Sequence, residues 1–400
     1  MAQEKSTTLE EALQVILGSE SNNPFKDMLE FMVQRTLEHE MTEHLGAKPY
    51  ERTGERKGHR NGYKPRTLIT RVGTLNLLVP QDRDGTFSTS LFERYQRSEK
   101  ALVTTLMQMY LQGVSTRKVA KVTEELVGRS FSSSLVSKLV KGLDGELAAW
   151  RKRRLEGEYP YLIVDARYEK VRDNHKIVSQ GVLIVSGVNA DGHREILAVK
   201  VADTENETTW SNLFKDLKDR GVRGVILVIS DDHKGIKAAV SRQFQGAAWQ
   251  RCQCHFSKNM LDIAPKASKA TLKAELHAIY DAADSVMAHR LLAETIARWQ
   301  DIRPEVALKL DEEAEDVLAC FNFPAEHRKR IRTTNSLERL NQELKRRTRV
   351  VRIFPDRDSC LRLASALCVE HSEEWLTGRR YLDMELLKEL EVPTELAVAL

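Results

Sequence analysis

The stretch Gly224-Val225-Ile226-Leu227-Val228-Ile229-Ser230-Asp231-Asp232 is a run of branched apolar residues that ends in two carboxylates. Such a run predicts a buried strand, and the carboxyl end of a strand in an open α/β sheet borders a crevice. A second run, Tyr161-Leu162-Ile163-Val164-Asp165, has the same character and also carries an acid. Because charges are rarely buried without partners, two hydrophobic strands that each carry an aspartate indicate a candidate site.

A third acid, Glu338, lies in the segment 333–341, where the leucines fall three and four residues apart and predict a helix. Taken singly, each of these acids is best interpreted as a helix cap or a surface charge. Together, in a basic chain, they favour a metal site, because hard divalent cations take carboxylate oxygens as ligands.

The region after Asp165 alternates between strand and helix patterns. In chain order, the pattern predicts strands at 177–189 and 194–202, a helix around 210–217, the strand ending at Asp231, a helix at 234–244 and a strand at 247–252. This is the order of a ribonuclease-H-like sheet, in which a parallel crossover places the fourth strand beside the first. We therefore expect Asp165 and Asp231 to be neighbours.

Composition sets broad limits on the molecule. The chain has 400 residues, which suggests two or three domains, and 30% of them are charged with a net charge of only +4. The distribution of charge must therefore indicate the partners. The five cysteines are scattered, which favours a reducing cytoplasm over a disulfide framework. No apolar run approaches the ~20 residues that a membrane helix needs.

Two segments are strongly basic. In residues 51–72, seven cations stand against two acids, and glycines favour a loop that either follows a phosphate backbone or is simply solvated. In residues 327–352, ten cations stand against two acids, which favours nucleic-acid binding over a solvated helix with balanced pairs. The candidate DNA-binding residues are Arg56, Lys57, Arg60, Lys64 and Arg66 in the first segment and Arg332, Lys345, Arg346, Arg347 and Arg349 in the second.

The N-terminal part is predicted to be mainly helical. Asn23 caps an expected helix over 24–45, a short hairpin is expected over 67–79, and residues 98–143 resemble a helix-turn-helix unit. Its third helix presents Ser133, Ser134 and Lys138, residue types that a recognition helix offers to a major groove, although many helical hairpins imitate this pattern. Residues 150–154 are interpreted as a basic linker.

Several spaced motifs carry a resemblance to a known family. They include Val164-Asp165-Ala166-Arg167-Tyr168, Ser230-Asp231-Asp232-His233-Lys234-Gly235, Trp249-Gln250-Arg251-Cys252-Gln253-Cys254-His255 and Arg332-Thr333-Thr334-Asn335-Ser336-Leu337-Glu338-Arg339-Leu340-Asn341. These motifs, in this order, resemble the Mutator-type transposases of bacterial insertion sequences. The resemblance runs from roughly Pro24 to Trp375.

The resemblance implies a ribonuclease-H-like DNA transposase with an Asp-Asp-Glu triad. Such enzymes bind the terminal inverted repeats of their element, cut there, and join the 3′-hydroxyl to target DNA. The triad maps onto Asp165, Asp231 and Glu338, with Asp232 standing where the family usually has glycine; we prefer Asp231 as the ligand because it directly follows the strand. Two ions of Mg²⁺, or Mn²⁺, are expected on these three carboxylates.

The family motif Cys-x-x-His maps onto Cys252 and His255. With Asn335, we interpret these residues as supporting the active site. A structural zinc site needs four ligands, and no second Cys/His pair at suitable spacing is evident, so packing and orientation are favoured over zinc binding.

Double-stranded DNA is the expected partner, with a homodimer or larger assembly that holds two element ends, in the bacterial cytoplasm at the nucleoid. The weighed alternatives are a helix-turn-helix DNA-binding regulator without catalysis and a ribonuclease-H-like nuclease without strand transfer. The expected organisation is an α/β catalytic domain interrupted by an all-α insertion and preceded by a helical DNA-binding region. The predicted divisions are 1–97 (helix, basic loop, hairpin), 98–157 (helix-turn-helix-like region and linker), 158–256 (catalytic domain, first part), 257–325 (helical insertion), 326–376 (catalytic domain, second part) and 377–400 (tail).

Overall fold

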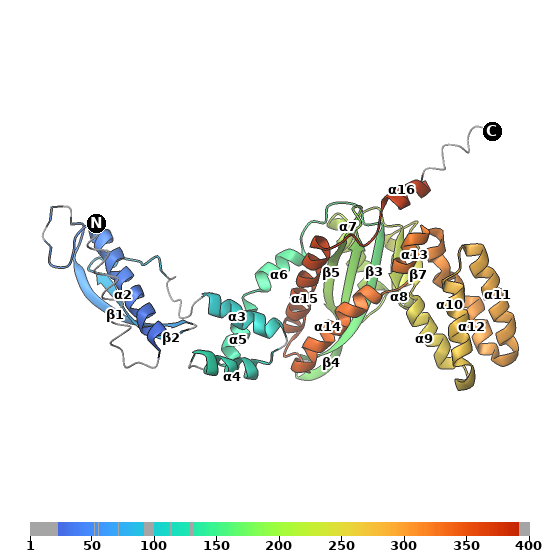
Figure 1. Cartoon of the computed structure of the whole chain (residues 1–400), viewed down its shortest axis with the longest axis horizontal. Helices are drawn as coiled ribbons and strands as arrows, with labels where there is room; N and C mark the ends of the chain where they lie inside the picture. Colours follow the sequence, from blue (N-terminus) through green and yellow to red (C-terminus); the bar gives the residue numbers. More distant parts are fainter. Residues whose placement is uncertain are drawn as a thin grey trace, which may run out of the picture. The chain divides into compact units, whose positions relative to one another are not determined.

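The computed structural model describes residues 23–51, 53–54, 56–70, 72–91, 100–112, 114–127 and 131–391. The chain forms two compact units, Met1–Val140 and Lys141–Leu400, and each is considered by itself (Figure 1). Within the described residues, no helix is long and apolar enough to span a membrane.

In the first unit, helix α2 (Pro24–Leu45) packs on a hairpin of strands β1 (Arg60–Thr70) and β2 (Gly73–Asp82). The Asn23 side chain accepts a hydrogen bond from the Lys26 amide and caps α2, as predicted. The loop prediction for residues 60–66 was wrong. Although these residues are polar, they pair with β2 along the hairpin, so cross-strand hydrogen bonding decides their structure.

Three further helices of this region lie close to their predicted positions: α3 (Lys100–Leu111), α4 (Thr116–Val127) and α5 (Ser133–Lys141). Leu106, Val119 and Val136 are fully buried, which agrees with the predicted apolar stripes. Ser132 begins α5, since its hydroxyl accepts a hydrogen bond from the Leu135 amide.

The second unit is built on a five-stranded sheet of order β5-β4-β3-β6-β7. The strands are β3 (Tyr161–Asp173), β4 (Lys176–Val188), β5 (Arg194–Ala202), β6 (Leu227–Ser230) and β7 (Ala248–Arg251). The first three pair antiparallel, whereas β6 runs parallel to β3 and β7 parallel to β6. The predicted order of elements and the predicted neighbours β3 and β6 are therefore confirmed. Strand β6 is shorter than predicted, because Gly224 adopts a φ of 70° and the ladder begins only at Leu227.

Helices cover both faces of this sheet. On one face, α7 (Glu207–Asp219) and α8 (Lys234–Gln243) bury Trp210, Phe214 and Ile236 against apolar side chains of the strands. The other face carries α14 (Asn335–Val351) and α15 (Arg357–Thr377), which contact β3 and β5 (Figure 1). Because successive strand residues point to opposite faces, Val164 enters the first core and Asp165 faces α14.

Helix α6 (Asp144–Arg151) occupies part of the segment that was predicted as a basic linker. That prediction was wrong, because the cations of this segment make fixed contacts within the unit. Arg151 donates to the Ser365 hydroxyl at 2.8 Å, and Arg153 pairs with Glu195 at 2.7 Å. These partners lie far along the chain and were not visible as a local pattern.

Between β7 and α14 the described chain is helical, as predicted. The elements are α9 (Gln253–Ile263), η1 (Lys266–Ser268), α10 (Lys269–Tyr280), α11 (Ser285–Ile302), α12 (Pro304–Leu318), η2 (Ala319–Asn322) and α13 (Ala325–Ile331). Helices α9 to α12 gather as a bundle beside the β7 edge of the sheet (Figure 1). Trp299 is fully buried in this bundle and its indole donates to Glu275, so it is a core residue. A last helix, α16 (Glu385–Glu391), follows.

Candidate active site

Asp165 lies on β3, and Asp231 directly follows the neighbouring parallel strand β6. The register pairs Ile163 of β3 with Ile229 of β6, and each aspartate follows its isoleucine by two residues. Neighbouring strands lie about 4.8 Å apart, so this register brings the two carboxylates to one edge of the sheet. Asp165 is 7% exposed, and its Oδ2 accepts a hydrogen bond of 2.7 Å from Asn341 Nδ2 on α14.

Both aspartates are buried in an acidic environment that changes their protonation. Burial, and then the charge of Asp231, raise the pKa of Asp165 to about 7. Burial also raises the pKa of Asp231, and the nearby Glu205 carboxylate adds to the effect. Each carboxylate is thus held where its ionised form is unfavourable, and a cation placed between them would relieve that cost.

The adjacent acid, Asp232, has a different environment. Its Oδ2 lies 2.8 Å from Nη2 of Arg251, a residue that is 2% exposed. The same guanidinium also pairs with Glu313 of α12. Asp232 is therefore used to neutralise a buried arginine, whereas Asp231 faces Asp165.

Glu338 lies in the first turn of α14 and joins a second cluster of ligand-type side chains. One ligand atom each from Cys252, His255 and Glu338 lie within 4.8 Å of one another, and His255 Nε2 is 3.7 Å from Glu338 Oε1. Burial, and then Cys252, raise the pKa of Glu338. A closed structural zinc site takes four protein ligands, and this trio supplies three.

Cys252 is fully buried at the start of α9, where the amide and hydroxyl of Thr334 both donate to its sulfur. Hydrogen bonds, first from Cys254 and then from His255, lower the pKa of the Cys252 thiol to about 3. The same contact raises the pKa of Cys254. The Cys252 thiolate raises the pKa of His255 to about 9.

The His255 side chain is the common neighbour of the acids. Its charge acts on Asp165, on Asp231 and on Glu338, and in each case it favours the ionised carboxylate. His255 is thus in direct contact with Glu338, which lies more than a hundred residues after Asp231 in the chain, and its charge also acts on the two aspartates.

Three residues of the site were not among the predicted ones. Asn341 bonds to Asp165, and its position three residues after Glu338, on the same helix face, was an available signal. Arg251 pairs with Asp232, the second of the two successive acids. Glu205 carries a carboxylate side chain that is 7% exposed and accepts hydrogen bonds from Tyr168 at 3.0 Å and Trp210 at 3.3 Å. Nothing in the local sequence distinguished Glu205.

His233 begins α8 directly after the acidic pair, but its side chain does not cap the helix. Its Nε2 lies 4.0 Å from Glu205 Oε1.

The predicted DNA-binding residues of the second unit fall into two groups. Lys345 and Arg349 are exposed on α14, and Arg346 is exposed but pairs with Glu343. Arg347 instead is buried and divides its guanidinium between Glu343 and Glu370, so it stabilises the packing of α14 on α15. Arg332, another predicted DNA-binding residue, is also engaged within the protein, because it pairs with Asp281 at 2.8 Å. Asn335, which was predicted to support the active site, is exposed and bonds to Cys254.

In the first unit, Lys57 and Lys64 are exposed, as are Ser134 and Lys138 on α5; the side chain of Ser133 lies outside the described residues. The remaining cations are more constrained: Arg56 donates to the carbonyls of Glu51 and Gly58, Arg60 pairs with Glu38 at 3.0 Å, and Arg66 is half-buried.

Comparison with known proteins agrees with this arrangement. The model of the family described as "Transposase, Mutator family" matches residues 1–378. The chain belongs to the Mutator family of transposases. It is similar to the transposase for insertion sequence element ISRM5 of Rhizobium meliloti (strain 1021), with 48% identity over 389 residues that cover 97% of this chain and 98% of the relative. It is also similar to the transposase for IS256 in transposon Tn4001 of Staphylococcus aureus, with 39% identity over 381 residues, 94% of this chain and 97% of the relative. The transposase for IS1081 of Mycobacterium tuberculosis (strain ATCC 25618 / H37Rv) is 41% identical over 344 residues, 86% of this chain and 83% of the relative.

Proposed function

We propose that this transposase cuts DNA at the terminal inverted repeats of its insertion sequence and joins the 3′-hydroxyl to target DNA, using Asp165, Asp231 and Glu338. The observation that supports this most strongly is the pairing of Ile163 with Ile229 on the adjacent parallel strands β3 and β6, since Asp165 and Asp231 each follow two residues later. The strand order, with three antiparallel strands followed by two parallel ones, supports a ribonuclease-H-like domain. The helices between β7 and α14 would then be an insertion within it.

The donor set fits Mg²⁺ or Mn²⁺, because these ions prefer carboxylate oxygens and retain several waters. Asp165, Asp231 and Glu338 would hold these ions. Bound there, such ions activate the attacking oxygen and stabilise the leaving one in an in-line displacement at phosphorus. The raised pKa of Asp165 supports this assignment, because burial and the charge of Asp231 disfavour the ionised carboxylate and a bound cation would offset both effects.

The surrounding residues would orient the acids. Asn341 donates a hydrogen bond to Asp165 Oδ2, and this bond would fix the orientation of the Asp165 carboxylate. His255 contacts Glu338 and would hold its carboxylate in place. Thr334 anchors Cys252, and thereby the start of α9, to the segment that leads into α14.

DNA would contact the basic side of α14 through Lys345 and Arg349, with Arg346 beside them. In the first unit, Lys57, Lys64 and the exposed face of α5 would add phosphate and groove contacts, which is the helix-turn-helix hypothesis. Two element ends must be held together, so we expect a dimer or larger assembly on DNA. Light scattering that shows only monomers, with and without end DNA, would refute this expectation.

The central experiment incubates the purified chain with labelled end DNA, a target plasmid and Mg²⁺. Asp165→Asn and Glu338→Gln are compared with Asp191→Asn and Glu326→Gln, which make the same chemical changes at exposed positions. We expect joined product from the wild type and from both control variants, and none from the two site variants.

The other outcomes distinguish the alternatives. Cleavage without joined product would favour a nuclease. DNA binding with no product, identical in all variants, would favour a regulator and would leave the acids without a catalytic role. Joined product from Glu338→Gln at the wild-type rate would remove Glu338 from the triad.

A further inference from the structure

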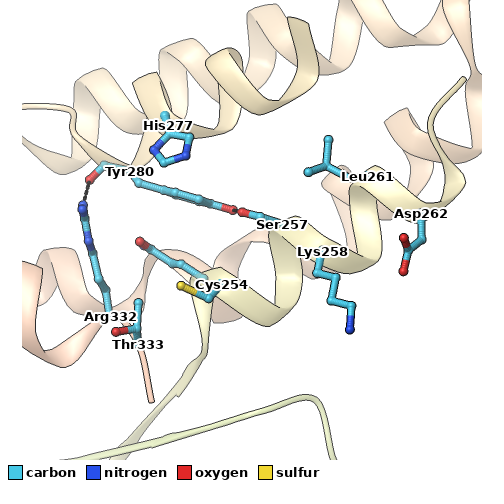
Figure 2. A pocket seen from close by; sticks show the side chains of 10 residues that line it. Cys254, Ser257, Lys258, Leu261, Asp262, His277, Tyr280, Arg332 and Thr333 are labelled. Atoms are coloured by element: carbon cyan, nitrogen blue, oxygen red, sulfur yellow. Dashed lines mark hydrogen bonds between the residues drawn. The ribbon is translucent and has the colours of Figure 1, made fainter. Parts of the chain in front are cut away.

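A pocket of about 410 Å³ lies between α9, α10 and residues 332–333 (Figure 2). Its volume is within the range of about 300–1,000 Å³ that small-molecule sites occupy. The lining residues are Gln253, Cys254, Ser257, Lys258, Leu261, Asp262, His277, Tyr280, Arg332 and Thr333. The residues assigned above to the catalytic chemistry do not line it, so it is a separate site.

The pocket and the catalytic cluster share a wall. Cys254 lines the pocket, while Cys252 and His255, on either side of it in the chain, belong to the cluster with Glu338. Thr333 also lines the pocket, and the next residue, Thr334, donates to Cys252. A DNA strand that reaches the three acids therefore passes the mouth of this pocket.

The lining suits an aromatic heterocycle that is attached to a phosphate. Tyr280 crosses the pocket toward Ser257, with their hydroxyls 3.0 Å apart, and the His277 ring stands above it (Figure 2). The two rings meet at 61° with their centroids 6.5 Å apart, and Leu261 supplies an apolar side. The exposed Asp262 and the half-buried Thr333 supply polar groups that can meet the edge of a base.

Two cations lie at the rim. Arg332 is held by the Tyr280 carbonyl at 2.9 Å and by Asp281, so its guanidinium has a fixed place beside the pocket. Lys258 is exposed on the next turn of α9 after Cys254. A fixed guanidinium and a mobile ammonium together are well suited to a phosphodiester.

We propose that this pocket receives one unstacked nucleotide of the DNA end, next to the phosphate that is cut. This inference rests on the proposed function, because it is the DNA in the catalytic cluster that presents the nucleotide. Taking a base out of the stack costs a few kcal/mol, and contact with aromatic side chains returns about 1–3 kcal/mol per base. Holding the base outside the helix would expose the neighbouring phosphate to the three acids.

The test uses 5-iodouracil, which crosslinks to aromatic side chains on irradiation. It is placed singly at each position around the cleavage site of an end duplex, bound to full-length Asp165→Asn protein, which should bind without cutting. We expect one position to crosslink to the α10 peptide that contains His277 and Tyr280. Leu261→Trp fills the pocket and should lower this yield about tenfold, the equivalent of ~1.4 kcal/mol. Leu308→Trp, on an exposed part of α12, is the matched control and should leave it unchanged.

The positional scan does not depend on the Leu261 variant, so misfolding of that variant cannot decide the outcome. If the duplex binds but no position crosslinks to α10, the pocket proposal is wrong while the proposed function stands. If crosslinks to α10 come equally from every position, the contact is non-specific and the proposal is also wrong. If end DNA does not bind at all, both the proposed function and the pocket proposal are refuted.

Discussion

Replacing Asp231 should mainly affect strand transfer, whereas replacing Asp232 should mainly affect the stability of the fold. Asp231→Asn removes a proposed metal ligand, whereas Asp232→Asn removes a partner of the buried Arg251. A metal ion supplies several kcal/mol of charge stabilisation in the transition state, and each 1.36 kcal/mol is tenfold in rate. Asp231→Asn should therefore lower strand transfer by about a thousandfold or more, and Asp232→Asn should leave measurable activity.

For stability we expect the reverse order, with Asp232→Asn the more destabilising of the two substitutions. Breaking a fully buried ion pair costs about 3–5 kcal/mol, but an exposed pair contributes only about 0–1 kcal/mol. Asp232 is 44% exposed, and Arg251 keeps Glu313, so we expect a loss of about 1–2 kcal/mol. At about 2–4 °C per kcal/mol for a unit of this size, the Tm should fall by about 2–8 °C. Asp231→Asn should instead raise the Tm without metal, because burial already favours the neutral form of this group.

The assay is a joined-product time course with Mg²⁺, combined with thermal unfolding in EDTA. Asp191→Asn serves as the control for both measurements, because Asp191 is exposed in a turn. The reasoning would be refuted if Asp232→Asn abolished joining at an unchanged Tm while Asp231→Asn stayed active. In that case Asp232 would be the ligand, and its pairing with Arg251 would be a feature of the metal-free protein alone.

Three further predictions follow from the same site. Asn341→Ala should lower the joining rate about ten- to a hundredfold with little change in Tm, since outer partners of metal ligands have effects of this size; a stopped time course checks this. Burial and the charge of Asp231 raise the pKa of Asp165 to about 7, so the folded protein binds this proton more tightly than the unfolded chain. The contribution of this group to the stability of the metal-free protein is fully present below about pH 4 and is lost as the pH rises through 7, and Asp165→Asn should remove this part of the pH dependence in EDTA melts. Lys345→Ala and Arg349→Ala should each reduce the slope of log affinity against log salt by about 0.9, which filter binding across a salt series measures. Arg347→Ala should instead lower the Tm in thermal melts, because it removes a buried cation that pairs with Glu343 and Glu370.

The sheet of the second unit was predictable because its strands are apolar on both faces. Helices cover β3, β4 and β6 on both sides, so the sequence carries unbroken runs such as 161–164 and 227–229. By contrast, the polar half of β1 and the basic end of α6 were missed. Arg60 to Arg66 are strand only because β2 lies beside them, and α6 is held by Asp144–Arg362 and Arg151–Ser365 contacts across more than two hundred residues.

The same distinction applies to the site. Asp165, Asp231 and Glu338 were predictable because each stands at the end of an apolar strand or within a helical leucine pattern. Glu205 was not, because it lies in a connection, and only its Tyr168 and Trp210 contacts bring it to Asp231. Arg251 lies within one of the recognised motifs, but the sequence did not predict its pairing with Asp232. That pairing depends on α12 of the helical insertion, which supplies Glu313 as the second partner of the guanidinium.

Helix α14 carries both a proposed metal ligand, Glu338, and a proposed DNA-binding residue, Lys345. Leu337, Leu340 and Leu344 bury one stripe of it, and Asn341 points to Asp165. Lys345 is seven residues after Glu338, which is about two turns or 10 Å along the axis. A phosphate bound at Lys345 therefore belongs to DNA that adjoins the phosphate at Glu338, and a rigid helix sets the distance between them. An insertion of one residue between these two positions would rotate Lys345 by about 100°. Such a variant should keep its metal-dependent rise in Tm yet lose specific end cleavage, which separates positioning by α14 from metal binding.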